Sequence, residues 1–133
     1  DAQDKELVSL LPEDVNISAT NLRNDLQLLS SKKLGVIIND SIGRAWRVGT
    51  VGIALGSSGV LPLKDLRGAV DLFGNVLRVS ETADADALAS AACILMGEAD
   101  DGSPVVLVRG HQLARTDENA NILVRNKDDD LFR

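Results

Sequence analysis

Hydrophobic and polar positions follow two different periods along this chain, and together they predict helices and strands in mixed order. Residues 19–29 carry apolar side chains at three-and-four spacing, which predicts an amphipathic helix with Ser18 as its cap. Residues 85–96 repeat the pattern with many alanines, and Thr82 or Asp84 is predicted to cap this second helix. The glycine after it is expected to supply a left-handed helix end.

Short apolar runs outside these helices predict strands. The run at 34–38 is continuous and rich in β-branched residues, which is typical of a strand buried on both faces. With a strand at 6–11 and the intervening helix, it predicts a right-handed crossover unit. Further strands are predicted at 104–108 and, as an edge strand, at 122–124. This mixture favours the α+β fold class, a mixed β-sheet with packed helices.

The region between the two helices is rich in glycine. Six glycines from Gly43 to Gly68 predict loops and short strands there. Two apolar segments, 69–73 and 76–80, then flank Gly74 and Asn75, a two-residue connection that predicts a β-hairpin.

Composition restricts the classes of function. The chain has 133 residues, 44% of them hydrophobic, which suits one domain over 1–133 with a core of its own. Its 20 acidic and 14 basic side chains give a net charge of −6, which argues against broad binding to nucleic acid or to a membrane. The apolar stretches are too short to cross a bilayer, and no signal segment is recognised. Cys93, the only cysteine, lies among apolar residues, so a reducing compartment, the cytoplasm, is expected.

Candidate chemistry begins directly after the run at 34–38. Asp40 and Ser41 are expected at the carboxyl end of that strand, where open α/β sheets bind ligands. A carboxylate beside a hydroxyl offers the hard oxygen ligands that magnesium and manganese prefer. The spacing is equally compatible with Asp40 as a simple cap of the following turn.

The next loop adds two arginines. Arg44 and Arg47 can bind a phosphate or a carboxylate bidentately, although solvated ion pairs are the commoner role of arginines near acids. Trp46, between them, is predicted to be a buried anchor of the loop rather than a stacking platform. His111 is the only histidine, so neither a Ser–His triad nor a zinc site of histidine and cysteine ligands can be assembled.

One known family resembles this chain in several segments taken in order. They read LLPED, NDSIGRAWRVGTVGIALGSSG, DLRGAVDLFGNVLRVSETADADALASAACILMGEADDGSPVVLVRG and the terminal DDDLFR. Over nearly the whole chain they resemble the C-terminal half of the coenzyme F(420)-0:L-glutamate ligase family, the γ-glutamyl ligases of the deazaflavin coenzyme. The fold is expected to be that of this half of the ligase.

The resemblance implies a GTP-dependent ligase that requires a divalent metal, Mg or Mn. Such an enzyme adds L-glutamate to the deazaflavin precursor through an acyl phosphate. By position, Asp40 and Ser41 match the family's metal-binding aspartate and its neighbouring hydroxyl. Gly97 and Glu98 match a segment that contacts GTP and a second metal, with Arg44 and Arg47 as phosphate-binding candidates. Asp1 matches an earlier metal-binding aspartate.

This chain also departs from the family pattern. Residues 49–52 read Gly-Thr-Val-Gly, whereas family members commonly have Gly-Gln-Thr-Asp, and the motif around Asp1 is degraded. The family's N-terminal half is absent from these residues. A non-catalytic relative that binds a ligand or serves as an assembly module is therefore the alternative hypothesis. The family forms dimers with interlocked subunits, so a homodimer or association with the missing N-terminal half is expected.

Overall fold

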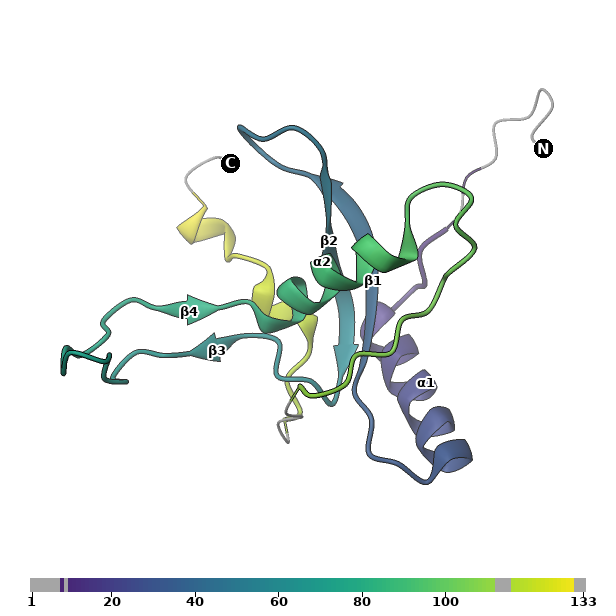
Figure 1. Ribbon diagram of the computed structural model, residues 1–133, viewed down its shortest axis with the longest axis horizontal. Coiled ribbons are helices and arrows are strands. Elements are labelled where there is room, and N and C mark those ends of the chain that lie inside the picture. Colours follow the sequence, from purple (N-terminus) through teal and green to yellow (C-terminus); the bar gives the residue numbers. More distant parts are fainter. Residues whose placement is uncertain (1–7, 9, 112–115, 131–133) are drawn as a thin grey trace.

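Helices and short antiparallel sheets intermix in the computed structural model (Figure 1), which describes residues 8, 10–111 and 116–130. This architecture confirms the α+β class. The helices are α1 (Val15–Ser30) and α2 (Asp84–Met96), and the strands are β1 (Val36–Gly43), β2 (Thr50–Ser58), β3 (Lys64–Asp65) and β4 (Glu81–Thr82). Two 3₁₀ turns follow, η1 (Ala120–Leu123) and η2 (Lys127–Asp129).

Helix α1 begins four residues before the predicted segment because Asp14, and not Ser18, caps it. The Asp14 carboxylate accepts a hydrogen bond from the Ile17 amide at 2.9 Å, which satisfies one of the free amides of the first turn. The Ser18 hydroxyl lies one turn further on and donates to the Asp14 carbonyl. The helix ends at Ser31, which adopts a left-handed conformation with φ 54°.

Strand β1 pairs with β2 in an antiparallel ribbon, and no parallel partner of the predicted crossover unit pairs with it among the described residues. The two two-stranded sheets of the described residues are both antiparallel. Strand β1 continues past the predicted end at Ile38 as far as Gly43. Strand β2 is formed by nine residues of the glycine-rich region, where loops and short strands are predicted. The predicted strand at 6–11 lies largely outside the described residues, and positions 8, 10 and 11 are not in a strand.

A β-bulge in this ribbon decides which helix each glycine of β2 faces. The register shifts between Ile38 and Asn39, so that Gly56 lies opposite Ile38 and Gly52 lies opposite Ser41. Positions 38 and 41 of β1 point to opposite faces, and so do their partners on β2. A Cβ atom at Gly52 would collide with Ala89 and Cys93 of α2, and one at Gly56 would collide with Val15 of α1.

Side chains of the two helices also satisfy the outer backbone edge of β2. The Ala54 amide donates to the Asp86 carboxylate at 2.9 Å, and the Ser90 hydroxyl donates to the Gly52 carbonyl at 2.6 Å. The Ser57 amide donates to the Asn16 side chain of α1 at 3.0 Å. The helices therefore cover an edge at which a further strand would otherwise pair.

The core is small and is built mainly from alanine. Ala54, Ala85 and Ala120 form its buried cluster, with Ile37 and Leu123 packed against it. The residues of 34–38 are only half-buried, so the prediction of a strand buried on both faces is wrong. The reason is that β1 has a single neighbouring strand and only partial helix cover within the described chain.

Helix α2 begins at Asp84, one residue before the predicted segment, and neither predicted cap takes that role. Ala83 occupies the cap position without a side-chain bond, and the Thr82 hydroxyl bonds the Asp84 carboxylate instead. The helix ends at Met96, and the following Gly97 has φ 74° and ψ 175°, so the predicted glycine ends the helix but does not adopt the predicted left-handed helical conformation. Two later strands are wrong: 104–108 has no regular secondary structure, and 122–124 overlaps the 3₁₀ turn η1.

Residues 64–82, here called the arm, project away from the helices and from the β1–β2 ribbon (Figure 1). The chain reverses at Gly74 and Asn75 as predicted, but the flanking segments make only an isolated bridge between Val70 and Val76. The Asp71 carboxylate organises the turn by accepting bonds from the Phe73 and Asn75 amides, each at 2.8 Å. Regular pairing occurs only near the root of the arm, between β3 and β4.

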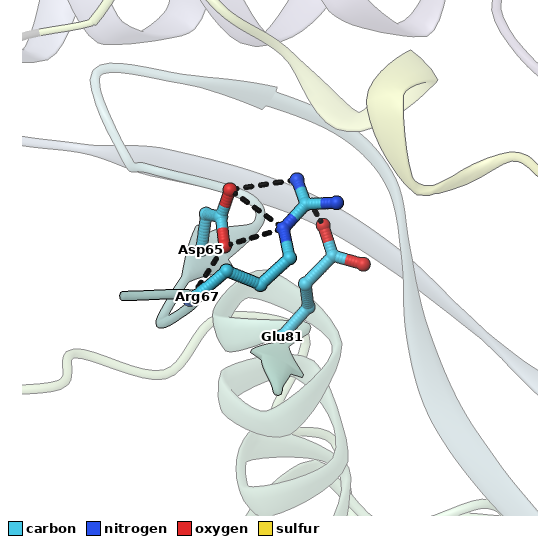
Figure 2. A network of polar contacts seen from close by, with 3 residues as sticks. All are labelled: Asp65, Arg67 and Glu81. Atoms are coloured by element: carbon cyan, nitrogen blue, oxygen red, sulfur yellow. Dashed lines mark hydrogen bonds and ion pairs between the residues drawn. The ribbon is translucent and has the colours of Figure 1, made fainter. Parts of the chain in front are cut away.

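Three charged side chains bind together near that root, as Figure 2 shows. The Arg67 guanidinium donates to both carboxylate oxygens of Asp65, at 2.7 to 3.0 Å, and approaches Glu81 at 3.3 Å. The side-chain hydrogen bond from Arg67, followed by that from its amide, holds the pKa of Asp65 below its ordinary value of 3.8. The bond to Asp65 correspondingly raises the pKa of Arg67.

This network predicts a specific acid titration. Because the pKa of Asp65 is lowered by folding, its contribution to stability is present above pH 3.8 and is lost as pH falls through the folded-state value. The carboxyl carbon of Asp65, followed by NMR, is expected to titrate below pH 3.8, and its pKa should rise toward 3.8 in Arg67→Gln, in which the bond from the amide of residue 67 remains. Asp71 is the internal control, because its lowered pKa comes first from the Asn75 side chain and should not respond. An unchanged Asp65 midpoint in Arg67→Gln would contradict this account.

Candidate functional site

The β1–β2 ribbon carries the first group of predicted site residues. Asp40 lies within β1, opposite Ile53 of β2, and its carboxylate is exposed. The prediction that Asp40 stands at a strand end is wrong, because β1 continues three residues further. One carboxylate oxygen accepts a hydrogen bond from the Ser41 amide at 2.7 Å. Asp40 therefore exposes carboxylate oxygens that could bind a cation, and it does so from within a strand rather than from its end.

Ser41 is half-buried and does not share a face with Asp40. Successive strand residues point to opposite faces, so the Ser41 side chain lies on the face of its partner Gly52, toward α2. The carboxylate and the hydroxyl are neighbours in sequence but diverge in space. They do not converge on a single point as the adjacent positions suggest.

The loop at the tip of this ribbon holds the two candidate arginines. The Arg44 guanidinium donates to the Gly49 carbonyl at 3.2 Å and thereby braces the loop. Arg47 is exposed in the same loop. Trp46 is 88% exposed and has a left-handed backbone with φ 58°, so its predicted burial is wrong. The loop extends past both helices and offers no core against which an indole can be buried.

The end of α2 carries the second group, Gly97 and Glu98. Asp101 folds back so closely that its carboxylate occupies the space of a Cβ atom at Gly97. The Asp101 carboxylate also lies 3.5 Å from the Ala99 amide. Glu98 itself is exposed. The positive φ and the close approach of Asp101 together explain why a glycine occupies position 97.

Asn39, which the sequence does not single out, connects these two groups. Its side-chain amide donates to the Cys93 sulfur at 3.0 Å and lies 3.7 Å from the Met96 sulfur, so β1 and the end of α2 are joined there. Asp40 follows Asn39 directly, and Glu98 comes two residues after Met96. Segments far apart in sequence thus meet at one place. A half-buried asparagine directly after an apolar run is the signal that could have revealed it.

The described residues do not form a complete metal site. Among them, no group of three or more His, Cys, Asp or Glu side chains is arranged to hold a metal ion. Asp40 and Glu98 offer carboxylate oxygens of the kind that magnesium and manganese bind. Asp1, the third acidic candidate, lies outside the described residues. Any metal bound by Asp40 or Glu98 therefore requires ligands beyond this part of the chain.

A polar hollow of about 230 Å³ lies elsewhere, beside the start of α1. Its lining residues are Asp14, Asn16, Ile17, Thr20, Asn21, Asn119 and Asn121. Asn16 bonds Asn121 and the β2 backbone, and Thr20 bonds Ser58, so these polar groups join α1 to its neighbours. None of the predicted site residues lines this hollow.

Comparison with known proteins identifies relatives of the chain. The family model described as F420-0:Gamma-glutamyl ligase matches residues 1–110. Coenzyme F420:L-glutamate ligase of Methanocaldococcus jannaschii is 46% identical over 126 residues, which cover 95% of this chain and 51% of that protein. The protein of the same name from Methanopyrus kandleri is 45% identical over 130 residues, or 95% of this chain and 52% of that protein. The chain thus spans about half the length of these curated relatives.

Proposed function

The chain belongs to the F420-0:gamma-glutamyl ligase family, and from this membership we propose that it forms part of an enzyme that joins L-glutamate to the deazaflavin precursor of coenzyme F420. The observation that carries the proposal is the junction at Asn39, which brings the Asp40 segment to the Glu98 segment. These are the two segments that the family resemblance singles out. The junction brings the two segments of the chain together, although Asp40 itself points to the face of β1 opposite to Asn39.

The proposed chemistry is the formation of an amide from a carboxylate and an amine. GTP transfers its γ-phosphoryl group to the precursor carboxylate, and GDP leaves. The glutamate amine then attacks the resulting acyl phosphate, loses a proton and displaces inorganic phosphate. Such transfers depend chiefly on positioned positive charge, and a divalent cation, Mg²⁺ or Mn²⁺, would neutralise the phosphate oxygens.

Within this chain the residues take separate parts in the proposal. Asp40 would supply a carboxylate ligand to a cation from one face of β1, and Ser41 would act from the opposite face, toward α2, the helix that Glu98 follows. Glu98 would supply a second carboxylate ligand. Arg47 would bind phosphate with its exposed guanidinium, while Arg44 holds the loop through Gly49. The remaining ligands would come from outside the described residues.

The proposal includes a location and an assembly. We place the protein in the cytoplasm, and in the part of the chain that the structure describes, no helix is long and apolar enough to cross a membrane. The proposed assembly is a homodimer, or a complex with a segment equivalent to the N-terminal half of the relatives, which this chain does not cover.

Position 52 favours the alternative, a relative that binds ligand without catalysis. The family resemblance places an aspartate there, whereas this chain has a glycine packed against Ala89 of α2. An aspartate at this position would collide with the α2 backbone. The packing of α2 against β2 in this chain therefore requires a residue without a side chain here. A module of this kind would still bind GTP or the deazaflavin precursor.

A ligase assay separates the two candidates. The chain, alone and together with the segment that completes the length of its relatives, is incubated with the deazaflavin precursor, L-glutamate, GTP and Mn²⁺. Glutamylated product and phosphate, both dependent on GTP, are the expected result. GTP binding by calorimetry without product would establish the binding module, and the absence of both would reject the family activity for this protein.

A further inference from the structure

We propose that the tip loop, residues 44–49 between β1 and β2, binds the planar heteroaromatic ring of an anionic ligand, with Trp46 as the stacking surface. GTP and the deazaflavin precursor both contain such a ring, so the choice of these two ligands rests on the proposed function. Neither Trp46 nor the recognition of a ring has a part in the cation and phosphate chemistry described above.

Trp46 presents most of its surface to solvent. It is 88% exposed, and Arg47 and Val48 beside it are exposed as well. A tryptophan side chain buries about 150–250 Å² when it is covered, so an exposed one leaves a large contact surface unused. Figure 1 shows the tip loop beyond the ends of both helices. The described part of the chain therefore leaves this tryptophan accessible to a ligand.

The backbone of Trp46 adopts a conformation that does not favour a bulky side chain. Its φ is 58°, in the left-handed region that a glycine enters without steric cost. The chain thus carries its only tryptophan where a glycine would be less strained. Strained positions of this kind concentrate at sites that hold ligands. The strain is accounted for if the side chain of Trp46 serves binding.

The tip loop is also braced before any ligand binds. The Arg44 guanidinium donates to the Gly49 carbonyl at 3.2 Å, so the first residue of the loop is tied to the last. Gly49 has φ 87°, which permits the chain to turn back into β2 there. A loop that is already ordered loses less conformational entropy when it binds.

The charge around Trp46 selects the kind of ring. Residues 41–63 contain two arginines, Arg44 and Arg47, and no acidic residue, although the whole chain carries −6. The face of an indole attracts cations, but two neighbouring guanidiniums repel a cationic ligand and attract an anionic one. A ring that carries a phosphate or a carboxylate group fits this loop, because Arg47 can bind the anionic group while the ring stacks on Trp46.

The distance to Asp40 favours GTP among the two ligands. Gly43, the last residue of β1, lies three residues beyond Asp40, which corresponds to about 10 Å along a strand. A nucleoside triphosphate in its extended form is longer than this. Its ring can therefore lie at Trp46 while its phosphates approach a cation at Asp40, and the deazaflavin precursor is the second source of a ring to be tested.

The first test observes Trp46 in the unmodified chain. The single tryptophan gives one indole N–H signal in an NMR spectrum, so no substitution is needed to assign it. With Mg²⁺ present, GTP should shift this signal in a saturable manner, because a stacked ring changes the magnetic environment of the indole. Inorganic triphosphate supplies anionic charge without a ring and should shift the signal far less. The same titration with the deazaflavin precursor determines which ring binds.

The second test measures affinity by calorimetry. Trp46→Leu should weaken the binding of the ring ligand about tenfold or more, whereas Trp46→Phe, which keeps an aromatic face, should weaken it less. Val48→Leu is the matched control, because Val48 lies in the same loop and is fully exposed, and it should leave the affinity unchanged. The affinity for inorganic triphosphate should be the same in all of these proteins.

Both tests use the chain alone and together with the segment that completes the length of its relatives. Equal affinity of Trp46→Leu and the unmodified chain for both rings would overturn the proposal, and ligase product formed by that variant would leave the proposed function standing. An indole signal that responds to the added segment but to neither ring would also overturn it, since Trp46 would then lie in a protein interface. If neither ring binds and no product forms, the proposed function fails as well.

Discussion

Asp40→Asn is expected to weaken Mn²⁺-dependent binding of GTP at least tenfold and to lower glutamate ligation by about two orders of magnitude. The substitution removes the charge of the proposed metal ligand while it preserves the size of the side chain and an acceptor for the Ser41 amide. Losing a charged partner costs about 1.5–3 kcal/mol, and 1.4 kcal/mol corresponds to a tenfold change in Kd. Because the Asp40 side chain is exposed, the fold should remain intact.

Calorimetry with GTP and Mn²⁺ measures the binding, and product formation measures the ligation. Asp25→Asn is a matched control, since Asp25 is an exposed carboxylate on α1. It removes the same charge and should change neither quantity. Equal GTP affinity in Asp40→Asn and in the unmodified chain would remove Asp40 from the site.

Gly52→Ala is expected to lower the free energy of unfolding by about 1–3 kcal/mol, the usual cost of overpacking. A Cβ atom at Gly52 would meet the carbonyl of Ala89 and the sulfur of Cys93 at distances that real Cβ atoms do not adopt. The obstacle at Ala89 is backbone, so relief requires α2 to move away from β2. That movement would lengthen the hydrogen bond from Ser90 to the Gly52 carbonyl as well.

Urea unfolding of the two proteins measures this difference, and the same ribbon provides the control. Gly43 lies on β1 with no atom within 4 Å of the position of its Cβ, so Gly43→Ala adds the same methyl group in open space. Gly43→Ala should have equal or greater stability than the unmodified chain. If both variants unfold at the same urea concentration, the close approach at Gly52 is not a constraint on the fold.

The two helices could be predicted from sequence because their signals are local. Apolar spacing located α1 and α2, and the glycine after α2 marked its end correctly. The predicted start of α1 is four residues late, because both Asp14 and Ser18 are residue types that cap helices well. Only the structure shows that the Asp14 carboxylate is the group that accepts a free amide.

The strands could not be placed in this way, because their pairing depends on residues distant in sequence. A glycine-rich segment reads as loop when considered alone, and β2 forms there because the glycines let two helices approach its backbone. The same pairing extends β1 through Asp40 and removes that residue from a strand end. The predicted burial of Trp46 is also wrong, since this residue lies in the loop between β1 and β2 and is 88% exposed.

The candidate site was predictable as a set of residues, but its geometry was not. Asp40, Ser41 and Glu98 stand out by residue type and by family resemblance, and sequence adjacency suggested that the first two converge. Successive side chains of a strand point to opposite faces, so Asp40 and Ser41 diverge. The contact of Asn39 with Cys93 instead brings the segment that contains Glu98 close to β1.

The alanine core sets the thermodynamic character of the whole chain. Burial of one CH₂-sized group contributes about 0.8 kcal/mol, so an interior led by Ala54, Ala85 and Ala120 supplies little free energy compared with leucines or phenylalanines. The large apolar side chains remain on the outside and contribute only when another surface covers them. Folding is then linked by mass action to whatever provides that surface, and the unfolding temperature rises with its concentration.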